Sequence, residues 1–263
     1  MARRNAHFRR RFNASGPLER VLILIVLAAA IGVTIGLLLP QVSSDAAKIT
    51  GGYTATGSAA DTLNALAVDD NQSSSGYDRD SFGFRTTDVD GNGCDVRDDV
   101  LARDLTDITY KYAGSCVVES GTLADPYTAQ TIHFVRGRAT SAKVQIDHVV
   151  ALNDAWASGL WKNSRKNDRV KYANDPDVLL ASQGDANNAK SEGINLYGSG
   201  VPKKSVGRWA ASTPSVWLPS NSGYQCSYMA KRVYIKDKYG LSMSSWEKSE
   251  TIGFLEQCQT AGE

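Results

Sequence analysis

The segment Ile146-Asp147-His148-Val149-Val150 combines a carboxylate and an imidazole within an apolar, β-branched run. About forty residues later the chain carries Asn187-Asn188-Ala189-Lys190. A neutral imidazole can take a proton from water near pH 7, and carboxylate and amide oxygens bind hard divalent cations. Together the two segments supply the base and the metal ligands that phosphodiester hydrolysis with one metal ion requires. The other histidines are His7, near the N-terminus, and His133, which we assign to a strand, so this chemistry would depend on His148.

The first forty residues differ in composition from the rest of the chain. Arginines gather in residues 1–20, and an uncharged apolar run then extends from Val21 to Leu39 and ends at Pro40. This run is long enough to cross a hydrocarbon core of about 30 Å, and the arginines hold its N-terminal end in the cytoplasm. We therefore predict a basic leader over 1–20, a transmembrane signal anchor over 21–40 and an exported remainder. Cleavage of the leader between 42 and 46, with secretion, is the alternative.

Charge and cysteine content limit the partners and the compartment. Lys and Arg number 29 against 28 Asp and Glu, so binding of a nucleic acid would need a local basic patch. Four cysteines follow the apolar run, as in proteins from oxidising compartments, and their spacing fits no zinc finger. Of the three possible connectivities, we predict Cys94–Cys116 and Cys226–Cys258. This pairing leaves the Asp-His segment uncrossed and contributes about 2–4 kcal/mol per bridge.

Periodicity predicts a mixed α+β domain over 77–263, preceded by a flexible linker over 41–76 in which 62–68 has helical character. Helices are expected at 98–105, 153–158, from about 185, 224–239 and 244–257. Strands are expected at 108–112, 115–119, 131–135, 143–150 and 177–181.

A series of short motifs follows in order between Tyr77 and Cys258. They are Tyr77-Asp78-Arg79-Asp80, Asn92-Gly93-Cys94-Asp95-Val96-Arg97, Ile146 to Val150, Ala155-Trp156, Arg169 with Tyr172-Ala173-Asn174-Asp175, Asn187 to Lys190, Trp217-Leu218-Pro219 and Tyr224-Gln225-Cys226. This series resembles the ββα-metal nucleases, the HNH (His-Me finger) family. It is most similar to secreted or surface-anchored actinobacterial proteins whose core is shared with the C-terminal nuclease domain of GmrSD restriction enzymes. The resemblance implies a ββα-metal core with added strands and C-terminal helices.

The resemblance also implies roles for individual residues. His148 would be the general base, and Asp147 and Asn187 would bind one Mg²⁺ or Mn²⁺ ion. Lys190 lies one helical turn from Asn187 and would pair with a phosphate or with Asp147. The substrate would be DNA, with RNA as the other possibility.

Substrate contacts are expected from Arg169 and Asn174, which lie in a matched segment. The chain departs from the family at the middle Asn that orients the catalytic histidine, because Val178 stands there. Asn174, Asp177 or a backbone carbonyl would have to take over this role.

A second candidate metal site is a calcium loop. Asp88, Asp90, Asn92 and Asp99 match positions 1, 3, 5 and 12 of the calcium-binding loop. The alternative is an Asp/Gly-rich turn before the helix at 98–105.

We therefore expect a membrane-attached, exported endonuclease that uses one divalent cation and needs no protein partner. The alternative is a catalytically inactive surface domain, linked by disulfides, that binds a polyanion or a cell-wall component. Base specificity cannot be read from residues that contact only phosphate and metal.

Overall fold

A computed structural model of the protein describes residues 58–194 and 216–260. The leader predicted over 1–20 and the anchor predicted over 21–40 lie outside these residues. Among the described residues, no helix is both long and apolar enough to span a membrane. The elements mix helices with two small sheets, so the predicted α+β class is confirmed.

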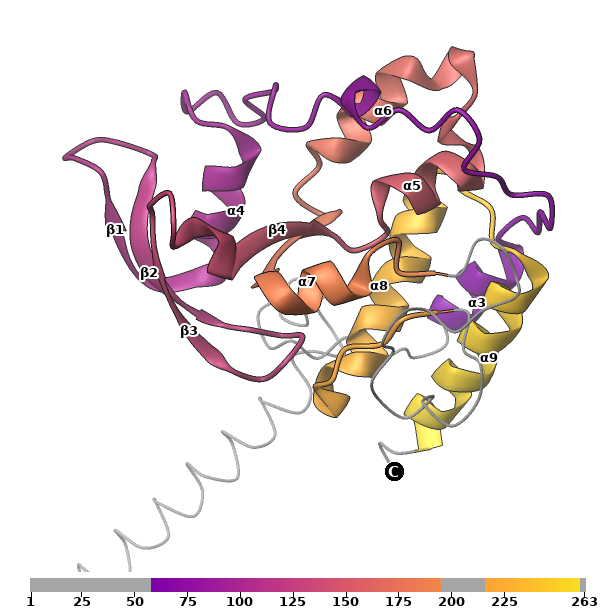
Figure 1. The fold of residues 1–263 in the computed structure, drawn as a ribbon. Helices are drawn as coiled ribbons and strands as arrows, with labels where there is room; N and C mark the ends of the chain where they lie inside the picture. The colour runs from indigo at the N-terminus through magenta and orange to yellow at the C-terminus, as the bar shows by residue number, and fades with distance from the viewer. Residues whose placement is uncertain (1–57, 195–215, 261–263) are drawn as a thin grey trace, which may run out of the picture. The chain divides into compact units, whose positions relative to one another are not determined.

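The two sheets are both antiparallel, and Figure 1 shows the larger one at one end of the domain, away from α5, α8 and α9. The larger sheet has the order β1-β2-β3, with β1 at Leu105–Tyr110, β2 at Val118–Ala124 and β3 at Thr131–Val135. The smaller sheet pairs β4 (Val144–His148) with β5 (Leu179–Gln183). His133 lies exposed on β3 beside Thr122, which confirms its assignment to a strand.

Helix α4 (Val96–Asp104) contacts strands of both sheets. The side chain of Asp95 accepts hydrogen bonds from the backbone of Arg97 and Asp98, which caps the N-terminus of the helix. One buried apolar cluster joins α4 to the strands and contains Val100, Leu123, Phe134 and Ile146, among others. Ile146 of β4 packs in this cluster, and Gln145 and Asp147 therefore lie on the opposite face of the strand.

The second apolar cluster lies among the helices. They are α3 (Ser58–Ala65), α5 (Leu152–Ala155), α6 (Lys166–Ala173), α7 (Gly184–Lys190), α8 (Gln225–Lys238) and α9 (Ser245–Thr260). Helix α5 continues into a π-helical turn over Trp156–Leu160. Helix α6 has no counterpart among the predicted elements, because its exposed face is highly charged and its buried residues are few.

The predicted linker over 41–76 is wrong in its second half. Helix α3 packs against α8 and α9, and Leu63 and Leu66 are buried in the apolar cluster of the helices. The main chain of Asp69 also bonds to Met243. The folded unit therefore includes residues 58–76, and its boundary lies before the predicted one at 77.

Two disulfides confirm the predicted pairing. Cys94–Cys116 joins the approach to α4 to the connection between β1 and β2, and Cys226–Cys258 joins α8 to α9. Each bridge closes a loop in which the Asp147-His148 segment does not lie.

Candidate active site

The centre of the site is a ββα unit, formed by β4, β5 and α7. Asp147 and His148 are the last two residues of β4 and pair with Leu180 and Leu179 of β5. Helix α7 follows β5 directly and packs back against both strands, and it lies just below β4 in Figure 1. Gly184 permits a close approach of the start of α7 to the turn over Ser141–Lys143, because a Cβ atom there would lie 2.1 Å from the carbonyl oxygen of Ala142.

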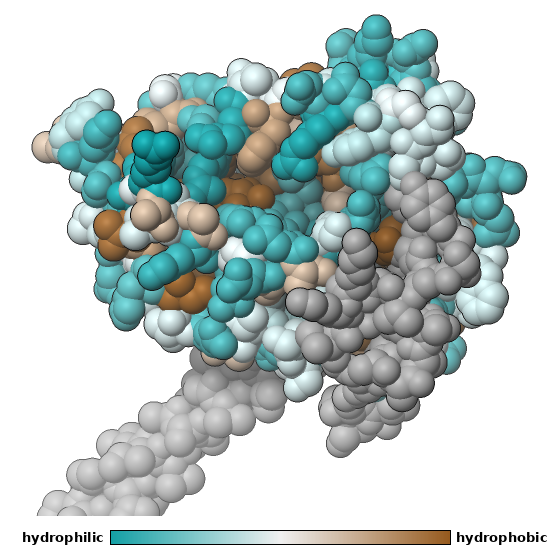
Figure 2. Space-filling view, in the orientation of Figure 1, coloured by the Kyte–Doolittle hydropathy of each residue, from teal (hydrophilic) through white to brown (hydrophobic). Residues whose placement is uncertain are grey.

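A pocket of about 360 Å³ opens where β4 ends. Asp147, His148 and Asn187 all line it, so the structure brings the three predicted residues together. Further lining side chains are mainly polar: Tyr77, Arg79, Gln145, Asn153, Asn188 and Glu192. Figure 2 shows that the face carrying α7 is hydrophilic over most of the described area, with hydrophobic residues in small separate patches. A lining of this composition suits a charged ligand better than an apolar one.

His148 is held by a main-chain carbonyl. Its Nε2 lies 3.0 Å from the carbonyl oxygen of Ala173. Because a carbonyl only accepts, Nε2 carries the proton and Nδ1 keeps its lone pair. Phe84 packs edge-on against the imidazole, with ring centroids 4.9 Å apart, and Tyr172 stacks on it at 6.4 Å. Burial lowers the pKa of His148 to about 3, so the imidazole is neutral at physiological pH.

The carbonyl of Ala173 thus orients the imidazole, as the middle Asn does in the family. A backbone carbonyl was one of the three alternatives that the sequence offered for this role. Val178, at the aligned position, is fully buried, and its carbonyl accepts a hydrogen bond from the backbone N–H of Val149. The side chains of Asn174 and Asp177 bond elsewhere and do not orient the imidazole. A backbone carbonyl leaves no signal in a sequence, which is why the alternatives remained open.

The main chain beyond His148 is fixed by polar side chains from three different helices. Lys190 of α7 donates to the carbonyl of His148 at 2.9 Å, and Arg232 of α8 lies 3.5 Å from the carbonyl of Val149. The hydroxyl of Tyr172, in α6, donates to the carbonyl of Val150. The ladder between β4 and β5 ends here, so these bonds replace the ones that a longer strand would make.

Asp147 is buried, and both of its oxygens are bonded. Oδ1 accepts from the ammonium of Lys190 at 2.8 Å, and Oδ2 accepts from the hydroxyl of Tyr127 at 2.5 Å. Burial raises the pKa of Tyr127 well above its usual value, which keeps this hydroxyl a donor. Each carboxylate oxygen retains a second lone pair with which it can accept or bind further.

Asn187 lies on the face of α7 that turns towards β4. Its Nδ2 donates to Oε1 of Gln145 at 2.8 Å, which fixes the orientation of the amide. The other amide atom, Oδ1, is an acceptor and a hard oxygen ligand.

Two predicted substrate contacts are wrong. Arg169 is 4 % exposed, donates to the carbonyl of Leu160 and lies over the ring of Trp156, so it stabilises the turn after α5. Lys190 is equally unavailable to a phosphate, because its ammonium is buried and committed to Asp147 and to the carbonyl of His148. The other predicted partner of Lys190, Asp147, is the observed one.

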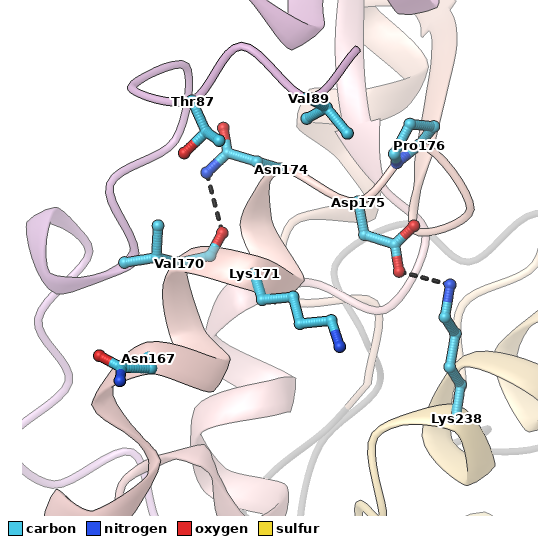
Figure 3. A pocket seen from close by; sticks show the side chains of 9 residues that line it. All are labelled: Thr87, Val89, Asn167, Val170, Lys171, Asn174, Asp175, Pro176 and Lys238. Atoms are coloured by element: carbon cyan, nitrogen blue, oxygen red, sulfur yellow. Dashed lines mark hydrogen bonds and ion pairs between the residues drawn. The ribbon is translucent and has the colours of Figure 1, made fainter. Parts of the chain in front are cut away.

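Asn174, the third predicted substrate contact, is also wrong. It is buried outside the His148 pocket and lines a separate pocket of about 600 Å³ with Lys171 and Lys238 (Figure 3). Its Nδ2 donates to the carbonyls of Gly83 and Val170, and its Oδ1 accepts from the backbone of Arg85. Asn174 therefore anchors the loop before α4 to the end of α6.

The predicted calcium loop forms a self-bonded turn. Asp88 accepts from the backbone of Gly91 and Gly93, and the amide of Asn92 donates to Asp90 and Asp99. Within 58–194 and 216–260, no three His, Cys, Asp or Glu side chains are grouped so as to hold a metal ion. The structure thus gives the calcium prediction no support.

Arg79 and Tyr77 were not predicted to have a role in the site, although they line the same pocket as His148. Their motif belonged to the matched series, but it carries no residue pattern that assigns a chemical function. Phe84, which packs on the imidazole, was missed for the same reason.

The family model of the GmrSD restriction endonucleases, C-terminal domain, matches residues 95–249, which is more than half of the chain. This protein belongs to the GmrSD C-terminal domain family. The chain is also similar to an uncharacterized secreted protein of Arthroderma benhamiae. It is 30 % identical over 198 residues, which cover 74 % of this chain and 82 % of that protein. No solved structure matches the chain. The whole ββα unit, from Val144 to Lys190, lies within the matched range.

Proposed function

We propose that this protein is an exported, metal-dependent endonuclease that hydrolyses phosphodiester bonds of DNA, with His148 as the general base. The observation that carries the proposal is the hydrogen bond from Nε2 of His148 to the carbonyl of Ala173. It leaves Nδ1 as the basic nitrogen of a neutral imidazole that lines the polar pocket. Membership of a restriction endonuclease family supports the same reaction class.

In the proposed reaction, Nδ1 of His148 takes a proton from a water molecule as the water oxygen attacks phosphorus. The bond from phosphorus to the 3′-oxygen breaks, and the leaving 3′-oxygen takes a proton from solvent. The surrounding residues keep the base in place: the carbonyl of Ala173 fixes the tautomer, and the bonds to the carbonyls of His148, Val149 and Val150 fix the backbone that carries it.

Asp147 and Asn187 are the residues that would hold a divalent cation such as Mg²⁺ or Mn²⁺. Both line the pocket and offer hard oxygen ligands, Asp147 through its remaining lone pairs and Asn187 through Oδ1. Few protein ligands are what a hydrated Mg²⁺ ion requires, since it keeps several water molecules. When bound, the cation supplies positive charge that stabilises the developing charge on the phosphate and on the leaving oxygen.

Export is supported by the two disulfides, which persist in oxidising compartments, and by the relative that is named a secreted protein. The anchor over 21–40 remains a prediction from the sequence.

Degradation of plasmid DNA tests the proposed function. The exported part of the chain should nick and linearise plasmid in the presence of Mg²⁺ or Mn²⁺, and EDTA should abolish this activity. His148→Ala should lower the rate by about 10²-fold or more, because a general base contributes that much. Equal activity of the wild type and His148→Ala would overturn the assignment of the base. A wild type that cleaves neither DNA nor RNA would leave the alternative, an inactive polyanion-binding domain.

A further inference from the structure

We propose that Arg79 binds the scissile phosphate, so that a segment outside the matched family range completes the active site. This inference rests on the nuclease function proposed above. The family match begins at residue 95, but Arg79 lines the pocket that contains Asp147, His148 and Asn187.

Arg79 lies in a segment that is anchored on both sides. Before it, the carbonyl of Ser75 accepts a hydrogen bond from the indole of Trp156 at 3.2 Å. After it, Phe82 is fully buried, 6.5 Å from the ring of Trp156, and Phe84 packs on His148. The backbone that carries Arg79 is therefore fixed relative to the imidazole, as a substrate contact requires.

The turn around Arg79 is stabilised locally as well. The carboxylate of Asp78 accepts from the backbone of Asp80 at 3.0 Å, and the hydroxyl of Ser81 donates to the carbonyl of Asp78 at 2.7 Å. A short 3₁₀ turn over Asp80–Phe82 follows and leads into the buried Phe82. Arg79 itself is exposed and lines the pocket.

The side chain of Arg79 bonds to the hydroxyl of Tyr77, which is neutral, so the charge of Arg79 is not compensated there. Among the described residues that line the pocket, it is the one Lys or Arg side chain. In the described part of the chain Arg79 takes part in no ion pair, whereas the ammonium of Lys190 is paired with Asp147. A planar guanidinium presents paired N–H donors that match two phosphate oxygens.

The experiment compares two substrates and four variants in the full exported chain. The substrates are plasmid DNA and bis(p-nitrophenyl) phosphate, a small diester that reaches only the reacting centre. Arg79→Gln removes the charge, and Arg79→Lys keeps the charge but loses the paired donors. Arg138→Gln is the matched control, since Arg138 is exposed and does not line the pocket. His148→Ala reports the loss of the base.

Arg79→Gln should lower kcat/KM about 10²-fold on both substrates, with an intermediate loss in Arg79→Lys. Arg138→Gln should leave hydrolysis of the small diester unchanged. The variants of Arg79 and Arg138 should keep the thermal midpoint of the wild type, because both residues are exposed. If Arg79→Gln hydrolyses the small diester as fast as the wild type, the assignment of Arg79 is wrong while the nuclease function stands. A wild type inactive on both substrates would overturn the nuclease function and the role of Arg79 with it.

Discussion

Lys190 bonds to Asp147 and to the backbone of His148 with a single buried ammonium, at 2.8 Å from Oδ1 and 2.9 Å from the carbonyl oxygen. The side chain of Lys190 has no exposed surface, and that of Asp147 is 5 % exposed. Burial lowers the pKa of Lys190, while the charge of Asp147 opposes this effect. The pair therefore ties α7 to the end of β4, and neither member can lose its partner without leaving a buried charge.

Lys190→Met should destabilise the fold by about 3–5 kcal/mol, because the carboxylate of Asp147 remains buried without its counter-charge. Urea unfolding measures this loss as a lower midpoint. Activity should fall as well, since the backbone carbonyl of His148 loses its donor.

The double variant Asp147→Asn/Lys190→Met serves as the control for this prediction. It should recover part of the lost stability, because no uncompensated charge remains. A double variant less stable than Lys190→Met by the full cost of Asp147→Asn alone would mean that the two residues act independently.

The buried imidazole of His148 makes stability depend on pH. In the unfolded chain a histidine binds a proton below about pH 6.5, but in the fold the pKa of His148 is lowered to about 3. Between these values the unfolded state holds one more proton, so stability falls as pH falls, by up to about 1.4 kcal/mol per pH unit from this group. Unfolding free energies measured from pH 7 down to about pH 4 test the effect.

His148→Asn should remove this component of the pH slope, whatever its effect on absolute stability. The matched control is His133→Asn, which replaces an exposed histidine of β3, so a change in slope specific to His148→Asn belongs to the buried imidazole. Parallel pH curves for the wild type and His148→Asn would contradict the buried, neutral imidazole.

The ββα unit was predictable because its signals are local. An apolar β-branched run identifies β4, and Asn187 and Lys190 occupy one face of a helix that follows a short strand. The pairing of the cysteines followed from their positions relative to Asp147-His148 for a similar reason. These features need only the order of residues along the chain.

The contacts of single side chains depended on packing between distant segments. Arg169 was expected at the substrate because it lies in a matched segment, whereas the ring of Trp156 and the carbonyl of Leu160 hold it inside. Arg79 lies far from His148 in sequence, and only the burial of Phe82 and the packing of Phe84 bring the two together. No periodicity in the sequence encodes such contacts.

Asn187→Ala should raise the cation concentration needed for half-maximal DNA cleavage by about 10-fold or more, because one oxygen ligand is lost. Binding of DNA in EDTA should change little, since the amide carries no charge. Titration of Mn²⁺ in a cleavage assay, beside fluorescence anisotropy with labelled DNA, separates the two effects.

Asn188→Ala is the matched control for Asn187. Asn188 also lines the pocket but is exposed, and it should leave the cation dependence near that of the wild type. Identical cation titrations for both variants would remove Asn187 from the set of metal ligands.

Lys236 and Lys238 lie two positions apart on α8 and should respond very differently to substitution by Met. Lys236 is fully buried, and its ammonium bonds to Asp154 at 2.9 Å and to Glu247 at 2.8 Å. Arg232 completes this buried network. Lys236→Met should cost about 3–5 kcal/mol, because two carboxylates then share one remaining cation in the core.

Lys238 is 31 % exposed and pairs with Asp175 and Asp177 at the surface. Lys238→Met should cost no more than about 1 kcal/mol, since solvent screens the pair. High salt should narrow the gap between Lys238→Met and the wild type but leave the defect of Lys236→Met, because buried charges are screened less. This buried network joins α5, α8 and α9, the helices that pack behind His148 and its carbonyl contacts. Equal urea midpoints for Lys236→Met and Lys238→Met would mean that the network does not stabilise the helical core.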